Sequence, residues 1–64
     1  MNTPTPEQIQ KLRLRSGLSQ VAFGEMLHSS RRTVQNWEAG IFEMHPVFWE
    51  YAKIKVQEMQ NERG

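Results

Sequence analysis

Hydrophobic residues recur at helical spacing through the first two thirds of this 64-residue chain. Residues three or four positions apart lie on the same side of a helix, so each pair can form one core-facing stripe. The pattern therefore predicts three short amphipathic helices before residue 40. Their stripes are Ile9 with Leu12, Phe23 with Leu27, and Val34 with Trp37.

Polar residues and glycines at the ends of these stripes predict where the first helix begins and ends. Thr5 is a good N-cap, Pro6 suits the first helical position, and Gln8 completes a capping box. The helix is expected to run to about Arg15, and Gly17 ends it. Residues 1–4 are expected to form a mobile tail.

Two further helices surround a tight turn. Ser19 can cap a helix through Leu27, because its hydroxyl accepts from backbone N–H groups that have no partner in the first turn. Ser30 can cap another through Ala39, and Gly40 tolerates the left-handed conformation of a helix end. Only two residues separate the helices, so they must cross, as in a helix-turn-helix over residues 19–39.

The last segment carries more apolar residues than one stripe can hold. A helix should begin at Pro46 and run to about Asn61, because no glycine or proline interrupts residues 47–62. We expect one long helix with a second apolar surface. Its inward residues are predicted to be Phe48, Tyr51 and Ala52, which leaves Val47, Trp49, Ile54 and Val56 to find cover.

The helix that follows Ser30 has an unusual polar face. Arg32, Gln35 and Asn36 lie opposite the apolar stripe, and Arg31 lies at its edge. Arginine is suited to read guanine, and glutamine or asparagine to read adenine. The alternative is an ordinary solvated face. However, two arginines occupy the first turn, where the helix dipole disfavours cations, and this suggests an anionic partner.

At this point the chain resembles the DNA-binding domains of phage repressors and Cro proteins, the lambda repressor-like helix-turn-helix family. The resemblance extends from Ile9 to Gly40 without a gap, and Arg13 matches the family's helix-1 arginine. It implies an all-α domain of four helices, or five if the last region divides. The other matching residues are Leu18, Ser19, Gln20, Phe23, Glu25, Leu27, Ser30, Arg31, Thr33, Val34, Trp37, Glu38 and Gly40.

The resemblance also implies roles for individual residues. Arg13 should form a structural ion pair with Glu38, with a phosphate contact as its alternative, and Gln20 should bond a DNA phosphate and brace the reading helix. The base-reading candidates are Arg31, Arg32, Thr33, Gln35 and Asn36. The DNA-backbone candidates are Ser19, Gln20, Lys11, Arg15 and Ser30.

Several positions depart from the family pattern. His28 stands where the turn glycine usually lies, which implies some backbone strain. Gly24 replaces a small alanine at about 1 kcal/mol of helix propensity, and Ser29 replaces an apolar core residue. All three are expected to weaken the domain. Residues 41–45 are apolar and acidic where many relatives are basic, which puts phosphate anchoring by this loop in doubt.

Composition narrows the function classes. Without cysteine there is no disulfide or thiolate site, and His28 and His45 lack metal-ligand spacing, so we expect no metal or cofactor. No small-molecule ligand and no catalytic constellation is evident, and no membrane span or signal peptide is seen. We therefore expect a single domain over residues 1–64, not an enzyme, in the cytoplasm of a bacterial host.

The net charge of +1 says little until it is divided along the chain. Residues 1–40 hold five of the eight lysines and arginines but three of the seven acidic residues. Positive charge on the helix-turn-helix half is what docking on DNA requires.

The expected function is a homodimeric repressor of phage or mobile-element type, bound to a palindromic double-stranded operator. The dimer is inferred from surplus apolar surface, since large exposed patches usually mark interfaces. The interface candidates are Phe42, Val47, Trp49, Ile54 and Val56. Two alternatives stay open: an antitoxin whose remaining surface holds a toxin, and a protein-interaction module on the same fold.

Overall fold

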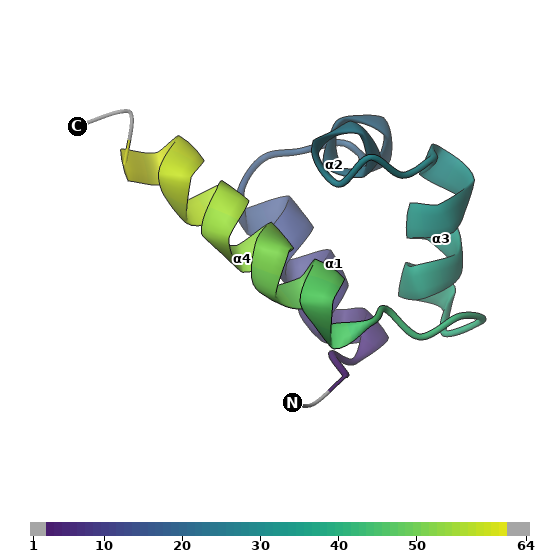
Figure 1. Cartoon of the computed structure of the whole chain (residues 1–64). Coiled ribbons are helices and arrows are strands. Elements are labelled where there is room, and N and C mark those ends of the chain that lie inside the picture. Colours follow the sequence, from purple (N-terminus) through teal and green to yellow (C-terminus); the bar gives the residue numbers. More distant parts are fainter. Residues whose placement is uncertain (1–2, 62–64) are drawn as a thin grey trace.

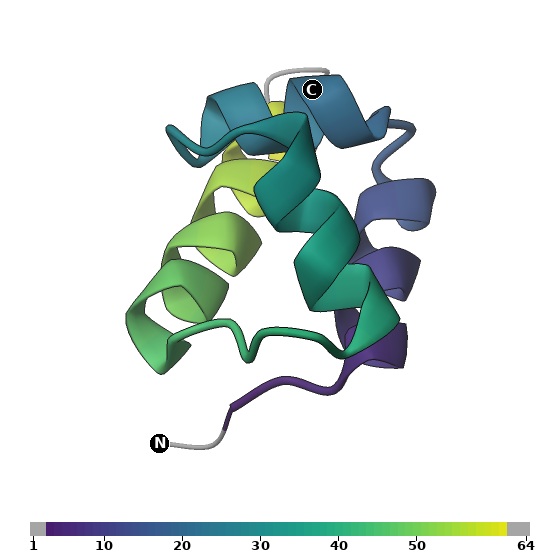
Figure 2. The ribbon, with the colours of Figure 1, turned by 90° about the vertical axis from the view of Figure 1, so that its right-hand side faces the viewer.

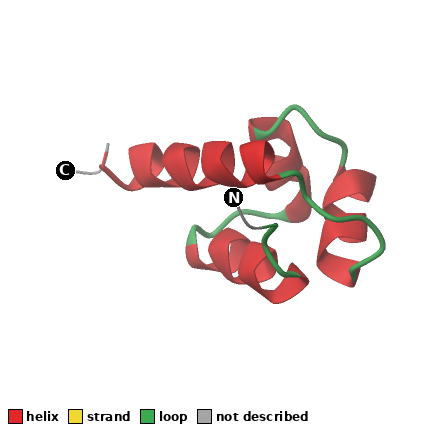
Figure 3. Cartoon of the chain, turned by 60° about the horizontal axis from the view of Figure 1, so that its bottom comes forward, coloured by secondary structure: helices red, strands yellow, loops and turns green. Residues whose placement is uncertain are grey.

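A computed structural model describes residues 3–61. This part of the chain contains four helices and no strand: α1 (Pro6–Arg15), α2 (Gln20–Met26), α3 (Arg31–Ala39) and α4 (Pro46–Asn61). Short loops connect them, and α4 continues without a break (Figures 1 and 3). The all-α prediction with one long last helix is confirmed.

The helices form two pairs. α1 and α4 lie side by side and run in the same direction, while α2 and α3 form the opposite end of the molecule (Figure 1). In the view of Figure 2, α3 lies in front, with α2 across its upper end and α1 and α4 on either side. α3 therefore covers the core on one side and leaves its other side open.

The predicted caps set the helix starts. The Thr5 hydroxyl accepts from the N–H of Gln8 at 3.1 Å, and the Gln8 side chain accepts from the N–H of Thr5 at 2.9 Å. The Ser19 and Ser30 hydroxyls accept from N–H groups three residues later. Gly40 ends α3 in the left-handed region, with φ 78°. At the start of each of these three helices, one N–H group without an intrahelical partner is thus satisfied by a nearby side chain, without tertiary contacts.

One hydrophobic core joins all four helices. Every residue of the three predicted stripes is buried, and Met44 from the loop before α4 is buried among them. Three partly buried hydrophobic residues pack against the edge of this core: Leu18, Met26 and Trp49. The members of the core are Ile9, Leu12, Phe23, Leu27, Val34, Trp37, Met44, Ala52 and Val56.

The inward face of α4 agrees with the prediction at Ala52 and differs from it at Phe48, Tyr51 and Val56. Ala52 and Val56, four residues apart, face the core, and Val56 is only 2% exposed. Phe48 and Tyr51 are 41% and 38% exposed instead, although the Phe48 ring lies 5.9 Å from that of Trp37. The small Ala52 and the compact Val56 let α4 pack against α1, where bulky aromatic rings would hold the two helices apart.

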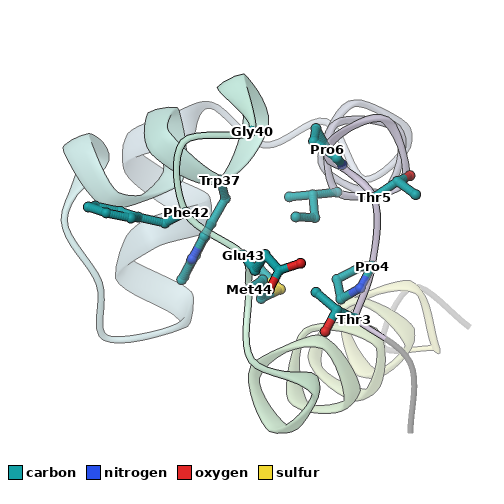
Figure 4. A pocket seen from close by; sticks show the side chains of 10 residues that line it. Thr3, Pro4, Thr5, Pro6, Trp37, Gly40, Phe42, Glu43 and Met44 are labelled. Atoms are coloured by element: carbon teal, nitrogen blue, oxygen red, sulfur yellow. The ribbon is translucent and has the colours of Figure 1, made fainter.

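The N-terminal segment also differs from the mobile tail that was expected. Pro4 is buried. Thr3, Pro4 and Thr5 line one wall of a hollow of about 280 Å³, and Glu43 and Met44 line another (Figure 4). Met1 and Asn2 lie outside the described residues. Pro4 is therefore packed against the folded domain, which the sequence did not indicate.

Candidate nucleic-acid interface

The turn between α2 and α3 sets the angle of the helix-turn-helix. His28 adopts the left-handed conformation, with φ 57°, as the missing turn glycine implied. Ser29 follows, and its N–H donates to the carbonyl of Gly24 at 2.7 Å. Its hydroxyl reaches the carbonyl of Leu27 at 3.3 Å, so the serine is used for local hydrogen bonding rather than for core packing.

Gly24 does not weaken the domain in the way its helix propensity suggests. A Cβ at this position would lie 2.6 Å from the carbonyl oxygen of Ser29 and 3.2 Å from that of Ser30. Backbone atoms cannot move aside as a flexible side chain can. The glycine is therefore what lets the turn close tightly over α2, and the expectation that alanine would serve better is wrong for this chain.

α3 presents its polar face away from the core. Val34 and Trp37 are buried, while Arg31 and Arg32 are exposed and point their charges into solvent. Gln35 and Asn36 are half-buried on the same outward side. The geometry therefore brings the arginines and the two amides together on one helix surface.

Two details of α3 were not anticipated. Ala39 is exposed, and its spacing of four from Gln35 and seven from Arg32 places it on the same face. That spacing was visible in the sequence, but a methyl group carried no polar signal. Thr33 is half-buried, and its hydroxyl lies 3.1 Å from that of Ser30, so both hydroxyls belong to the helix cap.

An ion pair ties α1 to α3. The Arg13 Nε donates to Glu38 Oε2 at 2.6 Å, and the second terminal nitrogen donates to Oε1 at 3.2 Å. The remaining terminal nitrogen donates to the carbonyl of Leu18 at 3.0 Å, in the loop before α2. The two side chains are 11% and 6% exposed. The arginine is thus part of the scaffold, as the family resemblance implied, and not a phosphate contact.

Gln20 extends this network to the reading helix. Its Nε2 donates to Glu38 Oε1 at 3.2 Å, and its Oε1 accepts from Gln35 Nε2 at 3.4 Å. Gln20 is the first residue of α2, so it links the start of that helix to the face of α3. Since the side-chain amide of Gln20 has two protons, one of them can still be donated to another acceptor.

Lys11 and Arg15 lie apart from the other residues proposed to contact the DNA backbone. Both line a hollow between α1 and α4, together with Trp49 and Lys53. Arg13 projects from the opposite flank of α1, toward α3. The spacing of four residues places both side chains on the α4 side of α1, apart from Ser19, Gln20 and Ser30.

The dimer-interface candidates in the C-terminal third do not form one continuous surface. Val47 and Ile54 are 59% and 54% exposed on α4, on the side opposite the buried Val56. Val56 belongs to the core and is excluded as an interface residue. Trp49 is half-buried beside α1, and Phe42 is exposed in the loop that follows α3.

That loop offers no cation. The N–H groups of Ile41 and Phe42 donate to the carbonyl of Asn36 at 2.9 and 3.3 Å, which closes the end of α3. Both side chains are exposed, while Met44 anchors the loop in the core. Phosphate contacts by lysine or arginine must therefore come from other segments.

Within residues 3–61, no three histidine, aspartate, glutamate or cysteine side chains are grouped as metal ligands. No helix of this range is both long and apolar enough to cross a membrane.

Two crossed helices, a tight turn between them and a polar face on the second helix define a helix-turn-helix domain. A helix-turn-helix family model matches residues 9–46, and the chain belongs to this family, in its Cro and lambda repressor-like form.

A comparison with curated proteins adds one relative. Over 56 residues the chain is 32% identical to the Type II methyltransferase M.MspI of Moraxella sp.. The match covers 88% of this chain but 13% of that enzyme. The similarity is therefore confined to a small part of the methyltransferase.

Proposed function

We propose that this protein is a homodimeric transcriptional repressor that inserts α3 into the major groove of an inverted repeat and occludes a promoter. The exposed face of α3 is the observation that carries the proposal. It holds Arg31, Arg32, Gln35 and Asn36 opposite a buried stripe, on a helix that the scaffold holds rigidly.

The chemistry of this face fits base edges better than it fits solvent alone. Arg32 is exposed in the first turn of α3, and the N-terminal residues of a recognition helix are those that meet bases. An arginine that bonds guanine bidentately contributes roughly 1–3 kcal/mol of discrimination. Gln35 and Asn36 follow one turn later and offer amides suited to adenine.

Backbone phosphates would be held beside α3. Ser19 and Ser30 cap the positive ends of the α2 and α3 dipoles, and the start of α2 lies beside α3, where Gln20 accepts from Gln35. Gln20 adds an amide at the first of these ends. In this proposal, these three residues set the register of the domain on DNA, and the α3 face reads the sequence.

The dimer would form through the outer face of α4. Val47, Tyr51 and Ile54 lie at spacings of four and three on this helix, and all three are exposed. A two-fold contact covers the same stripe twice and adds stability that a 64-residue domain lacks. Two copies would present their α3 helices about 34 Å apart, one turn of DNA.

Selection of bound duplexes from a random pool, followed by affinity measurements, tests the reading face. Selected sites should be inverted repeats. Arg32→Ala should weaken binding to the selected site by roughly 1–3 kcal/mol and bind random DNA nearly as well as wild type. Arg15→Ala is the matched control, an arginine on α1 that is away from this face, and it should change neither affinity.

Two results would refute the assignment. An equal loss on selected and random DNA would make Arg32 a phosphate contact. Failure to enrich any sequence, with a flat dependence of affinity on salt, would remove DNA reading altogether, because phosphate contacts make affinity fall steeply with salt.

The exposed stripe on α4 also supports a second candidate, an antitoxin that holds a toxin there. The two candidates differ in what covers Val47 and Ile54. A wild-type protein that sediments as a monomer at tens of micromolar would favour the antitoxin.

A further inference from the structure

A groove runs between α1 and α4, and DNA reading does not use it. Two adjoining hollows of about 220 and 350 Å³ share Leu12, Arg15 and Lys53, and a smaller one of about 90 Å³ continues from Arg15 to Met59. Together they extend along α1 from Gln8 to its C-cap Ser16 and along α4 from residue 49 to residue 60. At 1.5 Å per residue this is about 12–16 Å, the length of two to three helical turns.

The floor and rim of this groove differ in chemistry. Leu12 and Val56 are buried at its base, and Trp49 and Met59 add partly exposed apolar surface. The rim carries three cations, Lys11, Arg15 and Lys53, together with the amides of Gln8, Gln57 and Gln60. The hollow beside Trp49 is mainly apolar, the two hollows nearer Val56 and Met59 have mixed linings, and positive charge lies along the rim.

Two of these cations have no ion-pair partner in the part of the chain that the structure describes. Lys53 pairs with Glu50 at 2.9 Å, and its Nζ lies 5.5 Å from the centre of the Trp49 ring. Lys11 and Arg15 form no such pair with any described acidic residue and are exposed. Among residues 3–61, no carboxylate neutralises either charge through an ion pair.

We propose that this groove, which we call the α1–α4 groove, binds a short acidic amphipathic helix of a partner protein. Apolar residues on one side of that helix would cover Leu12, Trp49 and Met59, as in helix-in-groove recognition. Its glutamates or aspartates would pair with Lys11 and Arg15. The proposal does not depend on the base-reading assignment, because Arg13 separates the groove from α3.

Two other occupants fit less well. A second copy docked symmetrically would place Lys11 and Arg15 against the same residues of its partner, since a two-fold contact uses one patch twice. Duplex DNA would meet the cations, but its phosphates gain nothing from an apolar floor of Leu12 and Trp49. Complementarity in both charge and polarity favours the acidic helix.

The probe is a fluorescent helical peptide of about 14 residues, with leucines at positions i, i+3, i+4 and i+7 and glutamates elsewhere. Its matched control carries lysines in place of the glutamates. Titration into the full chain is followed by fluorescence polarisation. The acidic peptide should bind, the basic one should not, and affinity should fall with salt because the pairs are exposed.

Variants locate the site. Lys11→Glu and Arg15→Glu should each lower the affinity for the acidic peptide about fivefold or more, since an attraction becomes a repulsion. Arg32→Glu changes the same charge on α3 and should have little effect. Amide NMR spectra give a second readout: the Trp49 indole N–H should shift on titration, and that of Trp37 should not. Circular dichroism checks that each variant is folded.

Three outcomes would overturn the proposal. The first is no peptide binding up to millimolar concentration. The second is an equal loss for Arg32→Glu, which would indicate general charge attraction. The third is a loss of duplex DNA binding in Lys11→Glu as large as in Arg32→Glu, which would make the groove part of the nucleic-acid surface. Failure of DNA reading alone leaves the groove result intact, so the two proposals are tested separately.

Discussion

At Gly24 a single methyl group decides whether the helix-turn-helix can close. The position costs about 1 kcal/mol of helix propensity relative to alanine, yet the carbonyls of Ser29 and Ser30 occupy the space where a Cβ would lie. Sterics outweigh propensity here because the clashing atoms are backbone atoms of the turn itself.

Gly24→Ala is therefore expected to destabilise the domain by about 1–3 kcal/mol, in spite of its better propensity. For a domain of this size, each kcal/mol lowers Tm by about 4–8 °C. Glu25→Ala, an exposed neighbour on α2, is the control and should change Tm little. A higher Tm for Gly24→Ala would mean that the turn relaxes freely.

Arg13 illustrates why lysine cannot replace arginine at a forked contact. Its guanidinium reaches both carboxylate oxygens of Glu38 and the carbonyl of Leu18, three acceptors that a single ammonium cannot meet in this geometry. The pair is almost fully covered, so salt screens it weakly.

Arg13→Ala should cost about 3 kcal/mol, because it leaves the Glu38 charge buried and unpaired. Arg13→Lys should recover only part of this loss. Unfolding in urea at low and high salt measures both, and the loss should persist at high salt. Wild-type stability in Arg13→Lys would show that the fork is not needed.

The hydrogen bond between Gln20 of α2 and Gln35 of α3 leaves two roles for Gln35: reading a base, or positioning α3 through Gln20. Gln20 and Gln35 are joined through their amides, and Gln20 also bonds Glu38. A residue engaged in this way can position α3 without touching DNA.

If Gln20 bonds a phosphate, Gln20→Ala should weaken binding to specific and to random DNA alike, by about 1.5–3 kcal/mol. If Gln35 serves to hold Gln20, then Gln35→Ala should show the same uniform loss, and the double variant should lose less than the sum of the two. If Gln35 reads a base, its variant should instead change which base is preferred at one position. A double-mutant cycle on selected and random duplexes separates these results.

For the whole molecule, α4 has two apolar sides with different partners. Ala52 and Val56 pack inward, and Val47, Tyr51 and Ile54 face solvent. The same helix thus completes the core and offers the surface proposed for the dimer.

Ile54→Glu should shift the protein to monomer in sedimentation and abolish tight binding to a full operator, while helical circular dichroism is kept. Val56→Glu should instead unfold the domain, since it would bury a charge without a partner. If wild type is monomeric at tens of micromolar and binds a half-site as tightly as the full site, the dimer is wrong.

Local signals in the sequence determined most of the secondary structure. Thr5, Ser19 and Ser30 cap their helices through residues three positions away, and Gly40 ends α3 through its own backbone freedom. The stripes before residue 40 and the outward position of Arg32 followed from helical spacing alone. These features need no information beyond a few neighbouring residues, so the order of residues was enough.

Tertiary packing decided what spacing left open. α4 carries apolar residues on more than one side, and only its packing in the core placed Val56 inward and left Phe48 and Tyr51 largely exposed. The same contact placed Lys11 and Arg15 in the α1–α4 groove rather than beside α3. The close approach at Gly24 and the burial of Pro4 depend on distances between segments. Such distances arise only when the helices meet, and periodicity within one helix does not contain them.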